Sequence, residues 1–129
     1  MPFVRISVDS SRSPAEISAI SEGVYEALRE AIQAPKDDKF HVVTSHSPQE
    51  LIFSPDYLGI QRSEHFLAIQ IYFYAGRTVE QKKLIYKTIA DKLAINPGIR
   101  KEDIFILLID TPRENWSYGN GEAQFAPPA

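Results

Sequence analysis

An internal repeat with a period of about 65 residues constrains the fold of this chain more than any other feature. Arg12 corresponds to Arg77, and each arginine directly precedes a hydroxyl residue that is typical of a helix N-cap. Asp38 corresponds to Asp103, and each aspartate precedes an apolar run. Apolar residues also alternate in register in the two halves, as Val4, Ile6 and Val8 and as Ile69, Ile71 and Phe73. A chain that repeats in this way is expected to fold as two similar units.

Each half has the pattern of a strand, a helix and a second strand. Alternation predicts strands over residues 3–9 and 40–45 and, in the second half, over 66–74 and 104–109. Helical spacing of apolar residues predicts helices over 14–33 and 79–94. Right-handed crossovers make the two strands of each half parallel neighbours and place both helices on the same face. We therefore expect an α+β fold, a tandem β-α-β repeat with a four-stranded mixed sheet.

The chain is expected to form one domain over residues 1–129, with its pseudo-equivalent halves at 2–45 and 66–110. The segment between them, 46–64, is too long for a plain turn and is expected to hold a short strand or a packed loop. An aromatic, glycine-rich tail follows at 115–125. Two helices cover only one face of the sheet, while the other face also carries apolar and aromatic residues. We expect a homotrimer to cover it.

Composition excludes several classes of function. The net charge is -3 without a basic run, so nucleic acid is not an expected partner. The chain has no cysteine, and His41, His46 and His65 lack metal-ligand spacing, so neither a thiol nucleophile nor a metal site is predicted. No leader pattern or membrane-length apolar stretch occurs, which indicates a cytoplasmic protein.

Pro2 is the first candidate for chemistry. It begins the first predicted strand, and a small second residue usually allows removal of Met1. Pro2 would then carry a free secondary amine, and an α-amino group has a reference pKa of about 7.7–8.0. Burial in an apolar pocket would lower that pKa and favour a base, whereas a nearby carboxylate would favour the cation and hence an acid.

Several motifs, taken in order, give the chain a family resemblance. They are the Pro2 strand, the arginines before each helix, and the segments 35–40, 76–82 and 115–119. Together they resemble the tautomerase superfamily, and within it the malonate semialdehyde decarboxylase-like branch. The resemblance extends from Pro2 to Phe125. It implies a β-α-β repeat fold, a homotrimer and catalysis by the amino-terminal proline, without a metal or an organic cofactor.

The resemblance also implies roles for individual residues. Pro2 matches the catalytic proline, and Asp38 matches an aspartate that sets its protonation or activates water. Arg77 matches one of two arginines that hold the substrate carboxylate; the other position, two residues earlier, is Ala75 here. Arg12 matches a substrate-binding arginine of the smaller 4-oxalocrotonate tautomerases. Aromatic residues that line the decarboxylase pocket are matched by Trp116, Tyr118 and Phe125.

These residues favour an enzyme that transfers protons on a small oxo acid, interconverting its keto and enol forms. One alternative is decarboxylation of a 3-oxo acid such as malonate semialdehyde, which the loss of an arginine at Ala75 disfavours. Another is hydration or hydrolytic dehalogenation of a haloacrylate, with Asp38 activating water. A non-catalytic trimeric binding protein with a vestigial site is the alternative from a different class.

Overall fold

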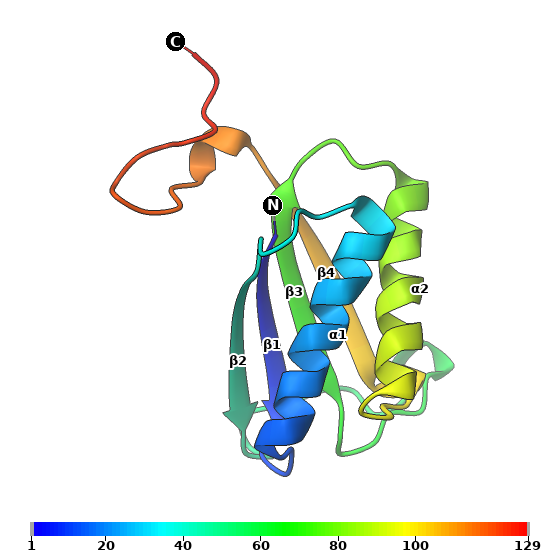
Figure 1. Cartoon of the computed structure of the whole chain (residues 1–129). Coiled ribbons are helices and arrows are strands. Elements are labelled where there is room, and N and C mark those ends of the chain that lie inside the picture. The colour runs from blue at the N-terminus through cyan, green and yellow to red at the C-terminus, as the bar shows by residue number, and fades with distance from the viewer. Residues whose placement is uncertain (1, 129) are drawn as a thin grey trace.

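The computed structural model describes residues 2–128, and these form a four-stranded sheet covered on one face by two helices (Figure 1). The elements are β1 (Phe3–Asp9), α1 (Pro14–Ile32), β2 (Phe40–His46), β3 (Leu67–Tyr74), α2 (Val79–Ile95) and β4 (Ile104–Thr111). The strand order is β2-β1-β3-β4. β1 is parallel to β2, β3 is parallel to β4, and β1 and β3 meet antiparallel at the centre. This confirms the predicted fold class and mixed sheet.

The repeat is visible in the local hydrogen bonds. Ser13 caps α1 and Thr78 caps α2, and each forms a capping box with the residue three positions later. At the end of each half, one backbone bond closes the sheet against the turn that enters the helix. It runs from Ser10 N to His46 O over 2.9 Å in the first half and from Ala75 N to Thr111 O over 3.0 Å in the second. Equivalent residues therefore occupy equivalent places in two oppositely directed units.

The hydrophobic core lies between the sheet and the two helices. Its fully buried members include Ile6 and Phe73 from the central strands and Leu28 and Leu93 from the helices. Gly23 on α1 lets the helices approach, because a Cβ there would lie 2.8 Å from the Leu93 side chain.

The opposite face of the sheet has no helix over it and is apolar along its two edge strands. Phe40, Val42, Phe105 and Leu107 project from the two edge strands, and each is between 40% and 49% exposed. Alternation along each strand places these residues away from the core. The expectation that only one face of the sheet is covered within the chain is confirmed.

After His46, the last residue of β2, the connecting segment up to residue 64 contains no strand, only a short 3-10 turn, η1 (Tyr57–Gly59). Of the two forms expected for this segment, a short strand or a packed loop, the structure shows the packed loop. The Arg62 guanidinium donates to the carbonyls of Ser54, Tyr57 and Ile60, which holds the loop on itself. Within residues 2–128, no helix combines the length and apolarity needed to span a membrane.

Candidate active site

The start of β1, the ends of β3 and β4 and the aromatic tail meet at one end of the sheet (Figure 1). Pro2 is buried there, immediately before Phe3. Phe3 pairs with Phe40 on β2 and with Tyr72 on β3. Continuing the antiparallel register places Pro2 opposite Phe73, with Asp38 just before the neighbouring strand β2. Two of the sequence candidates, Pro2 and Asp38, thus lie at the same end of adjacent strands.

Asp38 and Asp103 are the two charged residues that are buried within the described part of the chain. Asp103 accepts hydrogen bonds from the backbone nitrogen and the hydroxyl of Ser63, each over 2.7 Å. It therefore holds the chain just before that chain enters β3. Asp38 occupies the corresponding place before β2, which pairs with β1 in parallel as β4 pairs with β3. Burial raises the pKa of Asp38 above its ordinary value.

Arg77 lies at this same end, on the helix-covered side. Its Nη1 donates to the carbonyl oxygen of Tyr74 over 2.7 Å, and its guanidinium carbon lies 4.5 Å from the centre of the Phe73 ring. Its Nε is buried without a hydrogen-bond partner. Burial lowers the pKa of Arg77, and the negative charge of Asp110 opposes this. Across residues 2–128, no carboxylate comes within ion-pair distance of it.

Arg12, the repeat counterpart of Arg77, lies at the opposite end of β1 from Pro2. Its guanidinium is paired with two carboxylates, Asp9 at 3.4 Å and Glu16 at 3.1 Å. It also donates to the carbonyl oxygen of His65 over 2.9 Å. The structure therefore does not bring Arg12 together with Pro2 in one subunit, and it gives Arg12 three contacts within the fold.

The different surroundings of the two arginines come from two sequence differences. The positions that correspond to Asp9 and Glu16 in the second half are Tyr74 and Gln81. Neither of these side chains carries a negative charge at neutral pH. The same backbone geometry therefore leaves Arg77 without an ion-pair partner in the described part of the chain, whereas its counterpart is neutralised within the protein.

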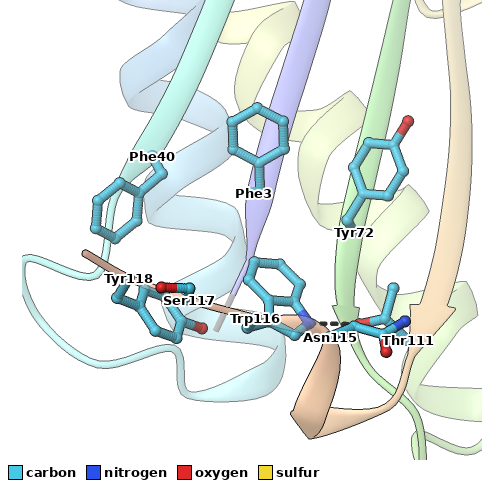
Figure 2. A pocket seen from close by; sticks show the side chains of 8 residues that line it. All are labelled: Phe3, Phe40, Tyr72, Thr111, Asn115, Trp116, Ser117 and Tyr118. Atoms are coloured by element: carbon cyan, nitrogen blue, oxygen red, sulfur yellow. Dashed lines mark hydrogen bonds between the residues drawn. The ribbon is translucent and has the colours of Figure 1, made fainter. Parts of the chain in front are cut away.

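A cavity of about 520 Å³ lies on the uncovered side of this end. Figure 2 shows the rings of Phe3, Phe40 and Tyr72 projecting from three neighbouring strands, with Trp116 and Tyr118 of the tail beneath them. Thr111, Asn115 and Ser117 complete the lining. Aromatic side chains dominate the wall, and a few polar groups lie near the tail, as is common for small-molecule sites.

The tail is held against the sheet by polar and aromatic contacts. Trp116 Nε1 donates to Thr111 Oγ1 over 2.6 Å, and its ring stacks on Tyr118 with centroids 5.7 Å apart. Phe125 lies outside the cavity lining, edge-on to Tyr118 at 5.7 Å. The hydroxyls of Tyr118 and Tyr74 are 3.1 Å apart, and burial is the main cause of the raised pKa of Tyr118. Trp116 and Tyr118 therefore line the cavity directly, whereas Phe125 packs against Tyr118 from outside it.

The sequence interpretation did not select Tyr74 or the cavity residues Phe3, Phe40 and Tyr72. Strand alternation did indicate an aromatic second face for Phe3, Tyr72 and Tyr74, and this signal could have identified a lining. Thr111 gave no sequence signal, because its role depends on where the tail turns. No group of three or more histidines, aspartates or glutamates within residues 2–128 is placed to hold a metal ion.

Comparison with known proteins identifies the class. Residues 38–119 match the family described as "Tautomerase enzyme". This chain is 38% identical over 124 residues to the probable tautomerase YusQ of Bacillus subtilis (strain 168), covering 96% of this chain and 98% of that protein. The chain therefore belongs to the tautomerase family of enzymes.

Solved structures place the chain more finely. A malonate semialdehyde decarboxylase inhibited by 3-bromopropiolate superposes with a TM-score of 0.90 at 35% sequence identity, over 95% of this chain and 93% of that one. A second malonate semialdehyde decarboxylase, described with decarboxylase and hydratase activities, gives a TM-score of 0.89 at 26% identity, over 95% of each chain. The resemblance expected from the sequence, including its decarboxylase-like branch, is confirmed.

Proposed function

We propose that this protein catalyses keto–enol tautomerisation of a small 2-oxo acid, with the free amine of Pro2 as the proton-transfer group. The proposal requires removal of Met1, which lies outside the described residues. Arg77 would bind the substrate carboxylate, Asp38 would set the protonation of the amine, and Trp116 and Tyr118 would exclude water. These residues lie at the same end of the sheet as Pro2, which supports their proximity to the amine.

The observation that carries the proposal is the contrast between the two arginines of the repeat. Arg12 is neutralised by Asp9 and Glu16, whereas Arg77, at the end where Pro2 begins β1, has no ion-pair partner among residues 2–128. A planar guanidinium matches a carboxylate and keeps its charge at every accessible pH. An acid substrate held there would present its carbonyl to the strand end that carries the proline.

The chemistry follows from the surroundings of the amine. Burial disfavours the protonated amine, so Pro2 can remove the proton next to the carbonyl carbon, leaving an enolate. The same proton, or one from water, then adds to the oxygen to give the enol, and the reverse sequence regenerates the ketone. Arg77 is partly buried over the Phe73 ring, so its interaction with a carboxylate would be screened less than at the open surface.

Decarboxylation of a 3-oxo acid is the second candidate, favoured by the similarity to malonate semialdehyde decarboxylases. In that reaction protonated Pro2 would polarise the 3-carbonyl while the carboxylate leaves as carbon dioxide. Ala75 argues against efficient decarboxylation, because the carboxylate must be aligned with the carbonyl system and only Arg77 is available from this turn. A displacement of the carboxylate by about 1 Å from its productive position can lower the reaction rate by on the order of 10²-fold.

We also propose that three copies assemble through the uncovered face of the sheet. Phe40, Val42, Phe105 and Leu107 leave that face apolar and partly exposed in the single chain. Exposed apolar surface of this kind usually marks an interface. Two solved structures with the same fold are each described as a symmetric trimer of fused 4-OT, which is compatible with this assembly.

The proposal is tested by blocking the amine. In one variant an extra residue precedes Pro2, so that the proline nitrogen is an amide, and intact mass verifies that the residue is retained. The control carries the same extra residue after residue 129. Both are assayed for ketonisation of phenylenolpyruvate and for malonate semialdehyde decarboxylation. We expect the control to tautomerise and the blocked protein to lose at least about 10²-fold in kcat/KM, since general acid–base catalysis contributes 10²–10⁴-fold.

Equal tautomerisation by the blocked protein and the control would refute the role of Pro2. If the control decarboxylates efficiently and tautomerises only in traces, the ranking of the two reactions is reversed. A control that binds the acids but turns over neither would favour the non-catalytic binding protein.

A further inference from the structure

The cavity next to Pro2 has no charged residue in its lining. Its eight lining residues are aromatic, hydroxyl-bearing or amide side chains. Arg77 approaches this end from the helix-covered side, above the Phe73 ring. An acid that enters from the uncovered side would therefore depend on cations outside the lining, and alternation places the exposed Arg5 on this face, two residues beyond Phe3 along β1.

Arg113 lies on that uncovered side. It belongs to the turn η3 (Arg113–Asn115), which leads directly into the lining residues Asn115 and Trp116. Its guanidinium carbon lies 5.3 Å from the centre of the Tyr74 ring. That ring is in turn in edge contact with Trp116 at 5.7 Å. Arg113 is thus placed beside the mouth of the cavity by contacts with residues of the site.

The charge of Arg113 is not used within the fold. Throughout residues 2–128, no carboxylate lies close enough to form an ion pair with it, whereas Arg12 and Arg100 each have two such partners. The position that corresponds to Arg113 in the first half is Pro48, so the repeat framework does not need a cation there. An arginine stacked on an aromatic ring and lacking a carboxylate is suited to receive one from a ligand.

We propose that Arg113 is a specificity-determining residue that binds the substrate carboxylate at the mouth of the cavity. This inference rests on the proposed function and adds a second cation to its acid-binding site. Arg77 donates to the backbone carbonyl of Tyr74 and Arg113 packs on the ring of the same residue, so both guanidiniums contact Tyr74. Arg113 is exposed, so it captures the acid but contributes little to aligning the reacting bonds.

The test compares Arg113→Gln, which removes the charge, with Arg113→Lys, which keeps it. The probes are phenylpyruvate and its methyl ester. For the kinetic assays the substrate is the enol form of each compound. The matched control is Arg29→Gln, because Arg29 also lies over a tyrosine ring, 6.0 Å from the Tyr25 centroid, but on α1. Binding is followed separately by the fluorescence of Trp116, the single tryptophan of the chain.

We expect Arg113→Gln to raise KM and the dissociation constant for phenylpyruvate about tenfold, the loss expected for one charge-assisted contact. The ester should bind and react as before, kcat should change little, and Arg113→Lys should recover part of the loss. An equal loss for acid and ester would show that Arg113 only packs the tail and would overturn the inference, as would an unchanged dissociation constant. A wild-type protein that binds phenylpyruvate without turnover would refute the proposed function while leaving the Arg113 comparison intact through fluorescence.

Discussion

The two arginines of the repeat make a matched experiment, because they occupy equivalent backbone positions in different surroundings. Arg12→Gln removes a guanidinium whose side chain is only 10% exposed. Its bond to the carbonyl of His65 contributes about 1.5 kcal/mol, as expected for a charged donor. The ion pair with the partly exposed Asp9 adds about 0.5 kcal/mol after allowance for solvent screening. The pair with the more exposed Glu16 is screened further by solvent and adds little to this sum. We therefore expect Arg12→Gln to lower the free energy of unfolding by about 2 kcal/mol and Tm by about 8 °C.

Arg77→Gln should have the reverse profile. It loses the bond to the Tyr74 carbonyl, but it also removes a partly buried charge that has no carboxylate, so the net cost in stability is about 1 kcal/mol. A charge-assisted contact with the substrate carboxylate is stronger, at up to about 3 kcal/mol, which corresponds to a loss of about 10²-fold in kcat/KM. Arg12→Gln should keep kcat/KM within about threefold.

Urea unfolding at a fixed subunit concentration and steady-state ketonisation of phenylenolpyruvate measure the two effects on the same preparations. The reasoning fails if Arg12→Gln leaves stability unchanged and lowers kcat/KM as strongly as Arg77→Gln. That result would place Arg12 in a substrate site formed with another subunit, the role that the resemblance to the smaller tautomerases implies.

Two further predictions concern pH and assembly. Burial lowers the pKa of His41 from 6.5 to about 4, so the unfolded chain binds a proton that the folded chain does not, and stability falls as pH drops through this window. When the pH is lowered from 7 to 5, the free energy of unfolding measured in urea should fall by about 1 kcal/mol more for wild type than for His41→Gln. Equal falls would show that His41 is not the cause. Leu107→Glu, on the uncovered sheet face, should convert the proposed trimer to a folded monomer by light scattering. A trimer of unchanged affinity would exclude that face as the interface.

The sequence was sufficient for the fold because the repeat fixed both the elements and their pairing. Apolar alternation, the hydroxyl caps at Ser13 and Thr78 and the prolines after each helix are local signals, and they set the elements to within about two residues. The crossover rule then left few arrangements of the four strands. Pro2, Asp38 and Arg77 were selected from the sequence, with the family resemblance assigning their roles, and all three lie at one end of the sheet.

The tertiary structure decided which of two equivalent arginines keeps an available charge. From the sequence, Arg12 and Arg77 precede similar helix caps, and the family resemblance implied a substrate-binding role for each of them. Only the folded chain shows that Asp9 and Glu16 converge on Arg12, while the Arg77 guanidinium packs over Phe73 without a carboxylate. The same holds for Thr111 and Arg113, whose places depend on how the tail turns back over the sheet. Local periodicity determines what each segment becomes, but the electrostatics of a site depend on side chains that meet only after the segments have packed.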